Sequence, residues 1–234
     1  EIVQDQCLIL AGTGSNCTEH AVGLSIAAER AGADGLLVVS PYYNKATPEG
    51  LVAHYTSIAH AVDIPVIIYN VPSRTGVDIP VSVYKTLSSL PNIAGVKEAS
   101  TDIEKVIRTI ALCGDALPVW AGNDAMTVPV MALGGKGVIS VASRVFPREF
   151  AAMTASAQSG DFTAAAKLQR SLVEAVELMG VHEIQFDYVR FPDNTRKYEK
   201  AGTIDFRNAY GESKAQAIQR FLMYATDILH EHGA

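Results

Sequence analysis

The stretch NIAGVKEAS, residues 92–100, gives the strongest single indication of the fold. Residues 93–96 are apolar enough to form a buried strand, yet the run ends on Lys97, with Glu98 beside it. Ammonium groups are rarely buried without a partner or a chemical task. The stretch therefore predicts a strand that carries a functional lysine at its carboxyl end.

Similar short apolar runs recur along the chain, and most of them are rich in β-forming side chains. A run without polar alternation is typical of a strand covered on both faces, as in a parallel sheet. We therefore expect six parallel strands, at residues 8–11, 35–39, 66–69, 93–96, 118–121 and 137–140.

Amphipathic segments separate these runs and predict helices. Thr18 followed by Glu19 favours a helix N-terminus, and helices are expected over residues 21–31, 103–110 and 161–179. The repeat of strand, loop and helix predicts an α/β fold, and its even spacing favours a TIM-type (β/α)8 barrel over an open sheet. In such barrels the chemistry lies where strands end, which is where the lysine is expected.

The composition indicates a globular chain with a sizeable core. Of the 234 residues 48% are hydrophobic, and the net charge of −6 gives no electrostatic basis for nucleic-acid binding. The three cysteines lack zinc-ligand spacing and are odd in number, which predicts a reduced, cytoplasmic chain. No run predicts a membrane span or a signal peptide. Residues 1–3 look like the end of a helix, so we expect further sequence upstream.

The residues that follow the predicted strands carry groups suited to one reaction. Tyr43 follows the second strand, Tyr69 ends the third, and Arg74 comes shortly after it. Parallel strands would place all three on one rim with Lys97. Two other strands end in glycine turns, at Gly12-Thr13-Gly14 and at Gly122 beside Asn123.

Together these groups suit Schiff-base chemistry. A lysine in a dry pocket has a lowered pKa, so part of it is neutral and can attack a ketone to form an imine. Tyrosine hydroxyls can pass protons, and the fork of Arg74 suits a carboxylate. Each residue alone has a plainer interpretation, as a solvated strand end, a core tyrosine or a surface charge. The combination on one rim favours the chemical interpretation.

Residues 1–179 resemble dihydrodipicolinate synthase, of the N-acetylneuraminate lyase superfamily of (β/α)8 barrels. The resemblance implies a cytoplasmic lyase of lysine biosynthesis that condenses pyruvate with aspartate semialdehyde. It also implies a covalent lysine–pyruvate Schiff base, with no cofactor and no metal. The motifs that carry it are AGTGSN (11–16), SPYYNKATPEGL (40–51), YNVPSRTG (69–76), GVKEAS (95–100), AGND (121–124) and GGKGVISV (134–141).

The resemblance also implies roles for individual residues. Lys97 would bind pyruvate as a Schiff base, and Tyr69 would handle protons beside it. Tyr43 would be the second tyrosine of the proton relay, or its neighbour Tyr42 would reach a partner subunit. Arg74 would bind the carboxylate of aspartate semialdehyde. The substrate-binding set is completed by Gly122 and Ile139, which would line the pyruvate pocket, and by Asn123.

The chain departs from the family in one respect. The family's sequence begins with two further βα units, the second ending in a GTTGE motif, and nothing in these 234 residues matches them. In the family the threonines of that motif bind the pyruvate carboxylate and complete the tyrosine relay. The resemblance therefore predicts six of the eight strands and part of the active site.

Residues 180–234 follow a different pattern. The segment GVHEIQFDYVRFPD, residues 180–193, predicts a strand, and Ser213 begins a predicted helix. This single βα unit resembles a stretch of glycoside-hydrolase barrels that carry EIQFDYVRFP. Asp187 would then correspond to a glycosidase carboxylate, but such enzymes usually need two carboxyl groups and no second candidate is evident.

The two patterns meet at Met179-Gly180 and indicate a chimera, in which residues 180–234 complete the domain formed by residues 1–179. Six strands plus one leave the barrel one strand short of eight, so it would be open, distorted or closed by another subunit. Exposed sheet edges favour a homo-oligomer. Three functions stay open: the lyase, a folded scaffold with little or no activity, and a glycosidase-related protein.

Overall fold

The structure of the chain, a computed structural model, describes residues 7–178. The strand predicted around Asp187 and the helix predicted from Ser213 lie outside the described residues. The strands are β1 (Leu10–Gly12), β2 (Gly35–Val39), β3 (Val66–Asn70), β4 (Ile93–Glu98), β5 (Val119–Ala121) and β6 (Gly137–Val138). The α-helices are α1 (Thr18–Arg30), α2 (Pro48–Ala59), α3 (Pro72–Thr75), α4 (Val81–Leu87), α5 (Ile103–Cys113), α6 (Thr127–Ala132), α7 (Pro147–Gln158) and α8 (Phe162–Leu178). Short 3-10 turns are η1 (Gly114–Ala116), η2 (Asp124–Met126) and η3 (Ala142–Arg144).

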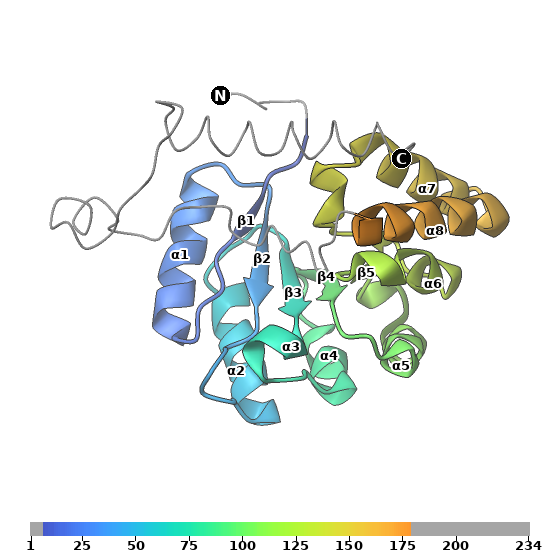
Figure 1. Cartoon of the computed structure of the whole chain (residues 1–234). Helices are drawn as coiled ribbons and strands as arrows, with labels where there is room; N and C mark the ends of the chain where they lie inside the picture. The colour runs from blue at the N-terminus through green and yellow to red at the C-terminus, as the bar shows by residue number, and fades with distance from the viewer. Residues whose placement is uncertain (1–6, 179–234) are drawn as a thin grey trace, which may run out of the picture.

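The six described strands form one parallel sheet in the order β1-β2-β3-β4-β5-β6. Each strand lies beside the next in the chain, with helices on the outside of the sheet (Figure 1). An order without reversal is that of a barrel wall, whereas a doubly wound sheet reverses direction at a switch point. The α/β fold expected from the sequence is confirmed, and residues 7–178 make an arc of a TIM-type barrel.

The main apolar core lies between the sheet and the helices. Alternate strand residues such as Leu36, Val38, Ile68 and Val96 are fully buried in it. The helices form a continuous layer over them, because α1 packs on α2, α2 on α4, and α4 on α5. Because successive side chains of a strand point to opposite faces, one set faces the helices and the alternate set faces the barrel interior.

The interior face of the sheet is less covered. Leu37, Val39, Tyr69 and Trp120 alternate with the core residues and are half-buried. In a closed barrel this face is filled by layers of side chains from all strands. The partial cover of these side chains is what an arc of six strands provides.

The first strand differs from its expectation. A strand was predicted at residues 8–11, but β1 covers Leu10–Gly12, and Leu8 and Leu10 are 79% and 42% exposed. β1 lies at the edge of the described sheet, so its apolar run lacks the cover that a central strand receives. The fifth and sixth strands are also shorter than predicted, at residues 119–121 and 137–138.

Two helix starts follow local capping. Asp102 caps α5 by accepting from the Lys105 N–H at 3.0 Å, and Asp161 accepts from the Ala164 N–H at 2.9 Å at the start of α8. The helix N-terminus expected at Thr18 is confirmed, since α1 begins there; the Thr18 hydroxyl lies 2.9 Å from Nδ1 of buried His54 and does not cap the helix. No helix within residues 7–178 is long and apolar enough to cross a membrane.

Truncation of the main core should destabilise the protein strongly. Leu36→Ala removes a fully buried side chain from β2 and should lower the free energy of unfolding by about 2–5 kcal/mol, because a cavity remains. Leu112→Ala on α5 is the matched control, since that leucine is 52% exposed, and should cost less than about 1 kcal/mol. Urea denaturation followed by circular dichroism measures both. Equal losses would contradict the position of the core.

Candidate active site

Lys97 ends the buried strand as the sequence predicts. It lies on β4 and is only 7% exposed. Its register partner on β3 is Tyr69, and its register partner on β5 is Trp120. The Lys97 Nζ lies 4.1 Å from the centroid of the Tyr69 ring. The structure thus brings together the predicted nucleophile and the predicted proton-handling tyrosine.

Gly122 makes room for the lysine side chain. Its N–H donates to the Glu98 carbonyl at 2.7 Å, which extends the β4–β5 pairing past Ala121. A Cβ at position 122 would lie 2.7 Å from the Ala99 Cβ and 3.0 Å from the Lys97 Cγ, closer than ordinary contacts. A glycine is therefore required for the backbone to approach Lys97, which suits its predicted place beside the pyruvate pocket.

Ile139 and Asn123 occupy the neighbouring strand ends. The Ile139 N–H donates to the Ala121 carbonyl at 2.9 Å, which places this half-buried residue just past β6. The Asn123 side-chain oxygen accepts from the Ala125 N–H at 3.0 Å and so caps the turn η2. Asn123 has a local structural task, and its predicted contact with substrate stays a prediction.

Tyr43 and Arg74 lie on two loops that meet beyond the strand ends. The Tyr43 N–H donates to the Thr75 carbonyl at 3.3 Å and joins the loop after β2 to α3. Arg74 is exposed on α3, which lies just beyond the end of β3 (Figure 1). Tyr43 is 89% exposed, and its neighbour Tyr42 is 40% exposed. The predicted second tyrosine, Tyr43, therefore lies on the surface, whereas Lys97 is buried.

The backbone of Tyr43 is strained. Its φ of 75° lies in the left-handed region, which bulky side chains rarely adopt. Such outliers persist where the surrounding structure holds them, and they cluster at functional sites. The conformation therefore supports a specific role for the exposed ring.

The turn after β1 has two different glycines. A Cβ at Gly14 would lie 2.6 Å from the Val39 N and Cγ1 atoms, so this glycine is needed for packing against β2. A Cβ at Gly12 would meet no atom within 4 Å. Open space beside the backbone is therefore present at Gly12 and absent at Gly14.

Sequence reasoning missed a set of polar side chains behind the site. Asn70, Asp78, Tyr84, Glu98 and Lys105 are joined by hydrogen bonds and ion pairs on the helix side of β3 and β4. We name this set the strand-end network. Two of its members, Asn70 and Glu98, directly follow Tyr69 and Lys97 in the chain. Because neighbouring strand residues point to opposite faces, the sequence could have indicated that these two side chains face the helices.

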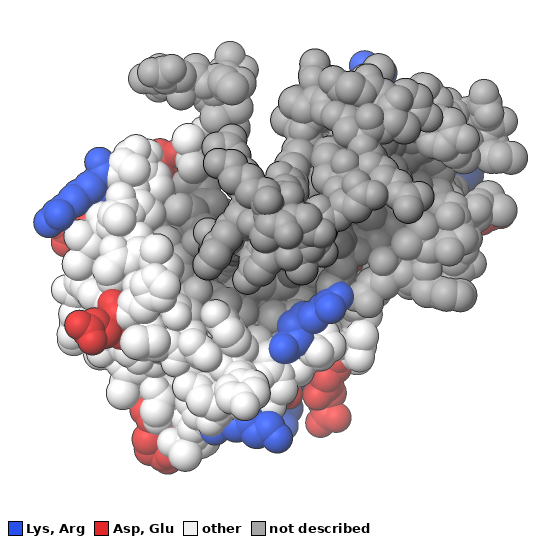
Figure 2. Space-filling view, turned by 60° about the vertical axis from the view of Figure 1, so that its left-hand side comes forward, with Lys and Arg blue, Asp and Glu red and all other residues white. Residues whose placement is uncertain are grey.

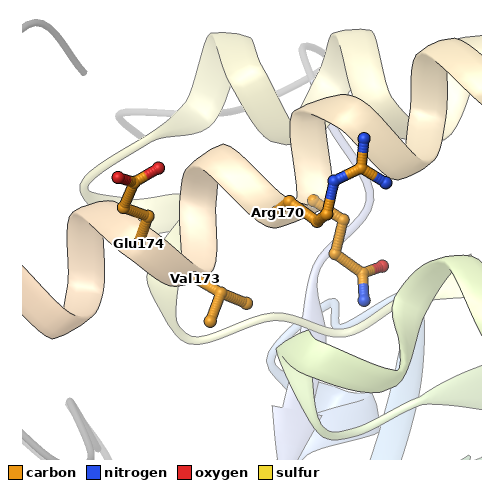
Figure 3. A pocket seen from close by; sticks show the side chains of 4 residues that line it. Arg170, Val173 and Glu174 are labelled. Carbon is orange, nitrogen blue, oxygen red and sulfur yellow. The ribbon is translucent and has the colours of Figure 1, made fainter.

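A separate pocket lies on the outer surface of α8. This pocket has a volume of about 260 Å³ and is lined by Gln169, Arg170, Val173 and Glu174. Figure 3 shows its labelled lining residues Arg170, Val173 and Glu174 projecting from this helix. Its lining includes none of the strand-end residues. Basic and acidic side chains are interspersed over the described part of the face in Figure 2. No group of three or more metal-ligating side chains occurs within residues 7–178.

Comparison with known proteins relates both parts of the chain to families. The model of the dihydrodipicolinate synthetase family matches residues 1–186. A second model, described as "Putative glycosyl hydrolase domain", matches residues 167–234. The two matches overlap around the end of α8, close to the junction expected at residue 179.

Curated relatives match the first part in sequence. The 4-hydroxy-tetrahydrodipicolinate synthase of Thermoanaerobacter sp. (strain X514) is 48% identical over 173 residues, which are 74% of this chain and 58% of that protein. The enzyme of the same name from Geobacter sulfurreducens is 45% identical over 76% of this chain and 62% of its own length. The chain thus spans about three fifths of the length of these relatives.

Solved structures agree on the fold. Dihydrodipicolinate synthase from Aquifex aeolicus is similar with a TM-score of 0.76 at 35% identity, over 98% of this chain and 76% of that one. A dihydrodipicolinate synthase from Acinetobacter baumannii, solved with pyruvate, gives a TM-score of 0.74 at 33% identity, over 97% of this chain and 77% of that one. With the family match over residues 1–186, these similarities establish that the chain belongs to the dihydrodipicolinate synthetase family.

Proposed function

We propose that the chain forms a Schiff base between Lys97 and pyruvate and directs the resulting enamine to aspartate semialdehyde. The observation that carries this proposal is the buried Lys97 at the end of β4, with its Nζ 4.1 Å from the Tyr69 ring centroid. The names of the relatives and the pyruvate complex of a structural neighbour support the same chemistry.

The reaction begins with carbon–nitrogen bond formation. The neutral Lys97 amine adds to the C2 carbonyl of pyruvate, the carbonyl oxygen takes one proton from the amine and one from a neighbouring acid and leaves as water, and a protonated imine remains. Loss of a methyl proton from this protonated imine gives an enamine. The enamine carbon attacks the aldehyde carbon of the second substrate, and the aldehyde oxygen takes up a proton. Water or an internal amine then displaces Lys97 and restores the free enzyme. Tyr69, whose ring centroid lies 4.1 Å from the Lys97 Nζ, would move these protons with its hydroxyl.

Substrate positions follow from the surrounding residues. Gly122 and Ile139 would line the pyruvate pocket beside Lys97, with Asn123 at its margin. Arg74, on the exposed turn α3, would attract the carboxylate of aspartate semialdehyde. No cofactor takes part in this scheme, because the lysine itself supplies the electron sink.

A second copy of the chain is part of the proposal. Tyr43 is 89% exposed on a strained backbone, and the edge strand β1 has exposed apolar residues. Exposed edges and aromatic side chains are typical of association surfaces. In a homo-oligomer a partner would cover Tyr43 or Tyr42 and let one of them join the proton relay.

A folded scaffold with little activity is the second candidate. The observation that favours it is the coverage, since the chain spans 58% of the Thermoanaerobacter relative, together with the half-buried interior face of the sheet. Residues 180–234 would then complete the same domain structurally. The match of this segment to a glycosyl hydrolase model keeps the glycosidase-related origin open, with Asp187 outside the described residues.

Borohydride trapping tests the proposal. Incubation with pyruvate and borohydride, followed by peptide mapping, should give one reduced adduct, on Lys97. Lys45 and Lys136 are exposed and serve as internal controls for unselective labelling. The other buried lysine among the described residues, Lys105, is paired with Asp78 and Glu98 and should stay unmodified. No adduct on Lys97, or equal labelling of the exposed lysines, would contradict the proposal.

A further inference from the structure

The residues next to Lys97 and Tyr69 turn to the opposite side of the sheet. Strand alternation sends Glu98 and Asn70 toward the helices, while Lys97 and Tyr69 share the interior face. Asn70 is completely buried and Glu98 is nearly so. A buried carboxylate costs free energy unless it is paired and hydrogen-bonded. The partners of Glu98 therefore indicate what holds it in this position.

Four donors converge on the Glu98 carboxylate. Its Oε1 accepts from the Asn70 Nδ2 at 2.7 Å and from the Ser100 N–H at 2.9 Å. Its Oε2 accepts from the Tyr84 hydroxyl at 2.9 Å, and the Lys105 Nζ lies 3.4 Å away. These donors come from the end of β3, the loop after β4, α4 and α5. One side chain therefore joins four separate segments behind the site.

Asn70 is fixed as completely as Glu98. Its second Nδ2 hydrogen reaches the Asp78 Oδ1 at 2.8 Å, and its Oδ1 accepts from the Ile79 N–H at 3.1 Å. Asp78 in turn pairs with Lys105. The backbone carbonyl of Asn70 accepts from Ala99 at 2.9 Å. Its bonds to Glu98 and Ala99 thus tie the end of β3 to the end of β4, and its bonds to Asp78 and Ile79 hold the segment after α3 against them.

The direction of the hydrogen bonds is defined. Burial, together with the neighbouring Glu98 charge, raises the pKa of Tyr84 well above its ordinary value. The phenol therefore keeps its proton and donates, and the Glu98 carboxylate accepts. An amide at position 98 would set an NH2 group against existing donors in either orientation: against Asn70 and Ser100, or against Tyr84 and Lys105.

The plain interpretation of the strand-end network is that it only stabilises the fold. Its place directly behind Lys97 supports a second role, in positioning that side chain. The backbone of Glu98 accepts from Gly122, whose missing Cβ leaves space for the Lys97 side chain. A shift of the Glu98 backbone would therefore move Lys97 relative to both Gly122 and Tyr69. Displacements of about 1 Å at reacting groups are enough to slow reactions by about a hundredfold.

We propose that Glu98 is a positioning residue for the Lys97 amine, acting through the strand-end network. The proposal rests on the Schiff-base function of Lys97 stated above. Glu98 does not touch substrate; it sets the strand ends from which Lys97 and Tyr69 face one another. Its effect should therefore fall on the rate of imine formation and not on the affinity for pyruvate.

The test compares borohydride trapping rates over a range of pyruvate concentrations. Glu98→Gln should lower the trapping rate at saturating pyruvate by about tenfold or more, and change the half-saturating concentration less than about threefold. Tyr84→Phe removes one donor while keeping the ring, and should lower the saturating rate by about threefold. It also keeps the proposal testable where Glu98→Gln does not fold.

Met153→Ala is the matched stability control. Met153 is completely buried in the separate cluster between α7 and α8, so its truncation destabilises the chain without touching the network. It should leave the trapping rate of the folded fraction unchanged. If Met153→Ala slows trapping as much as Glu98→Gln at equal thermal stability, or if both network variants trap at the unaltered rate, the positioning role is wrong. An unaltered chain that gives no adduct contradicts the Schiff-base function itself, and is recognised before any variant is made.

Discussion

Lys97→Met should abolish the pyruvate adduct and reduce lyase turnover to the background rate. Methionine is unbranched and close to lysine in length, so it can fill the space between Tyr69 and Gly122 without a cavity. It carries no amine, and an imine cannot form at that position. Because every step of the reaction passes through the covalent imine, loss of the nucleophile stops the reaction and does not merely slow one step.

The control for this variant is Lys136→Met, which changes an exposed lysine before β6. It should trap pyruvate at the unaltered rate. Circular dichroism and thermal melting establish that both variants fold. A folded Lys97→Met protein that still gives a pyruvate adduct in similar yield would show that another amine is the nucleophile.

Turnover by the 234-residue chain should be at least about a hundredfold below that of a full-length relative such as the Geobacter sulfurreducens enzyme, while imine formation survives. Lys97, Tyr69 and Gly122 would supply what the imine needs. These 234 residues contain no GTTGE motif, whose threonines, by the family resemblance, would hold the pyruvate carboxylate and link the tyrosines. Loss of a general acid–base partner costs about 10²–10⁴ in rate.

A coupled assay with pyruvate and aspartate semialdehyde measures this difference, with the trapping rate determined on the same preparation. A chain that traps pyruvate well and condenses slowly fits the expectation. Condensation at the rate of the full-length relative would contradict it, and would mean that other residues of the chain or of a partner copy replace the motif.

The fold could be predicted from sequence because a buried parallel strand has a simple signature. Continuous apolar runs such as residues 35–39 and 66–69 correspond to β2 and β3 almost residue for residue. The prediction was poorest for residues 8–11, where the run has the composition of a core strand but lies at a sheet edge. Composition alone does not specify which strands a sheet places at its edge.

The candidate site could be predicted in part. Lys97, Tyr69 and Gly122 meet because parallel strands end at one rim, and this follows from the order of motifs. Tyr43 is 89% exposed and has a φ of 75°, a conformation that no local propensity of tyrosine would suggest.

The network behind the site was missed for a related reason. Glu98 was noted in the sequence only as the neighbour of Lys97. Its importance arises from Asn70, Tyr84 and Lys105, which come from three other elements. The apolar pattern of a single segment cannot indicate contacts between residues so far apart in the chain.

A crystal structure of the chain soaked with pyruvate tests the central claim most directly. The account predicts continuous density from the Lys97 Nζ to C2 of pyruvate at the end of β4, with Tyr69 beside the new bond and Gly122 against the Lys97 stem. An ordered arc of strands in which Lys97 is unmodified, while pyruvate occupies another place or another lysine, would contradict it.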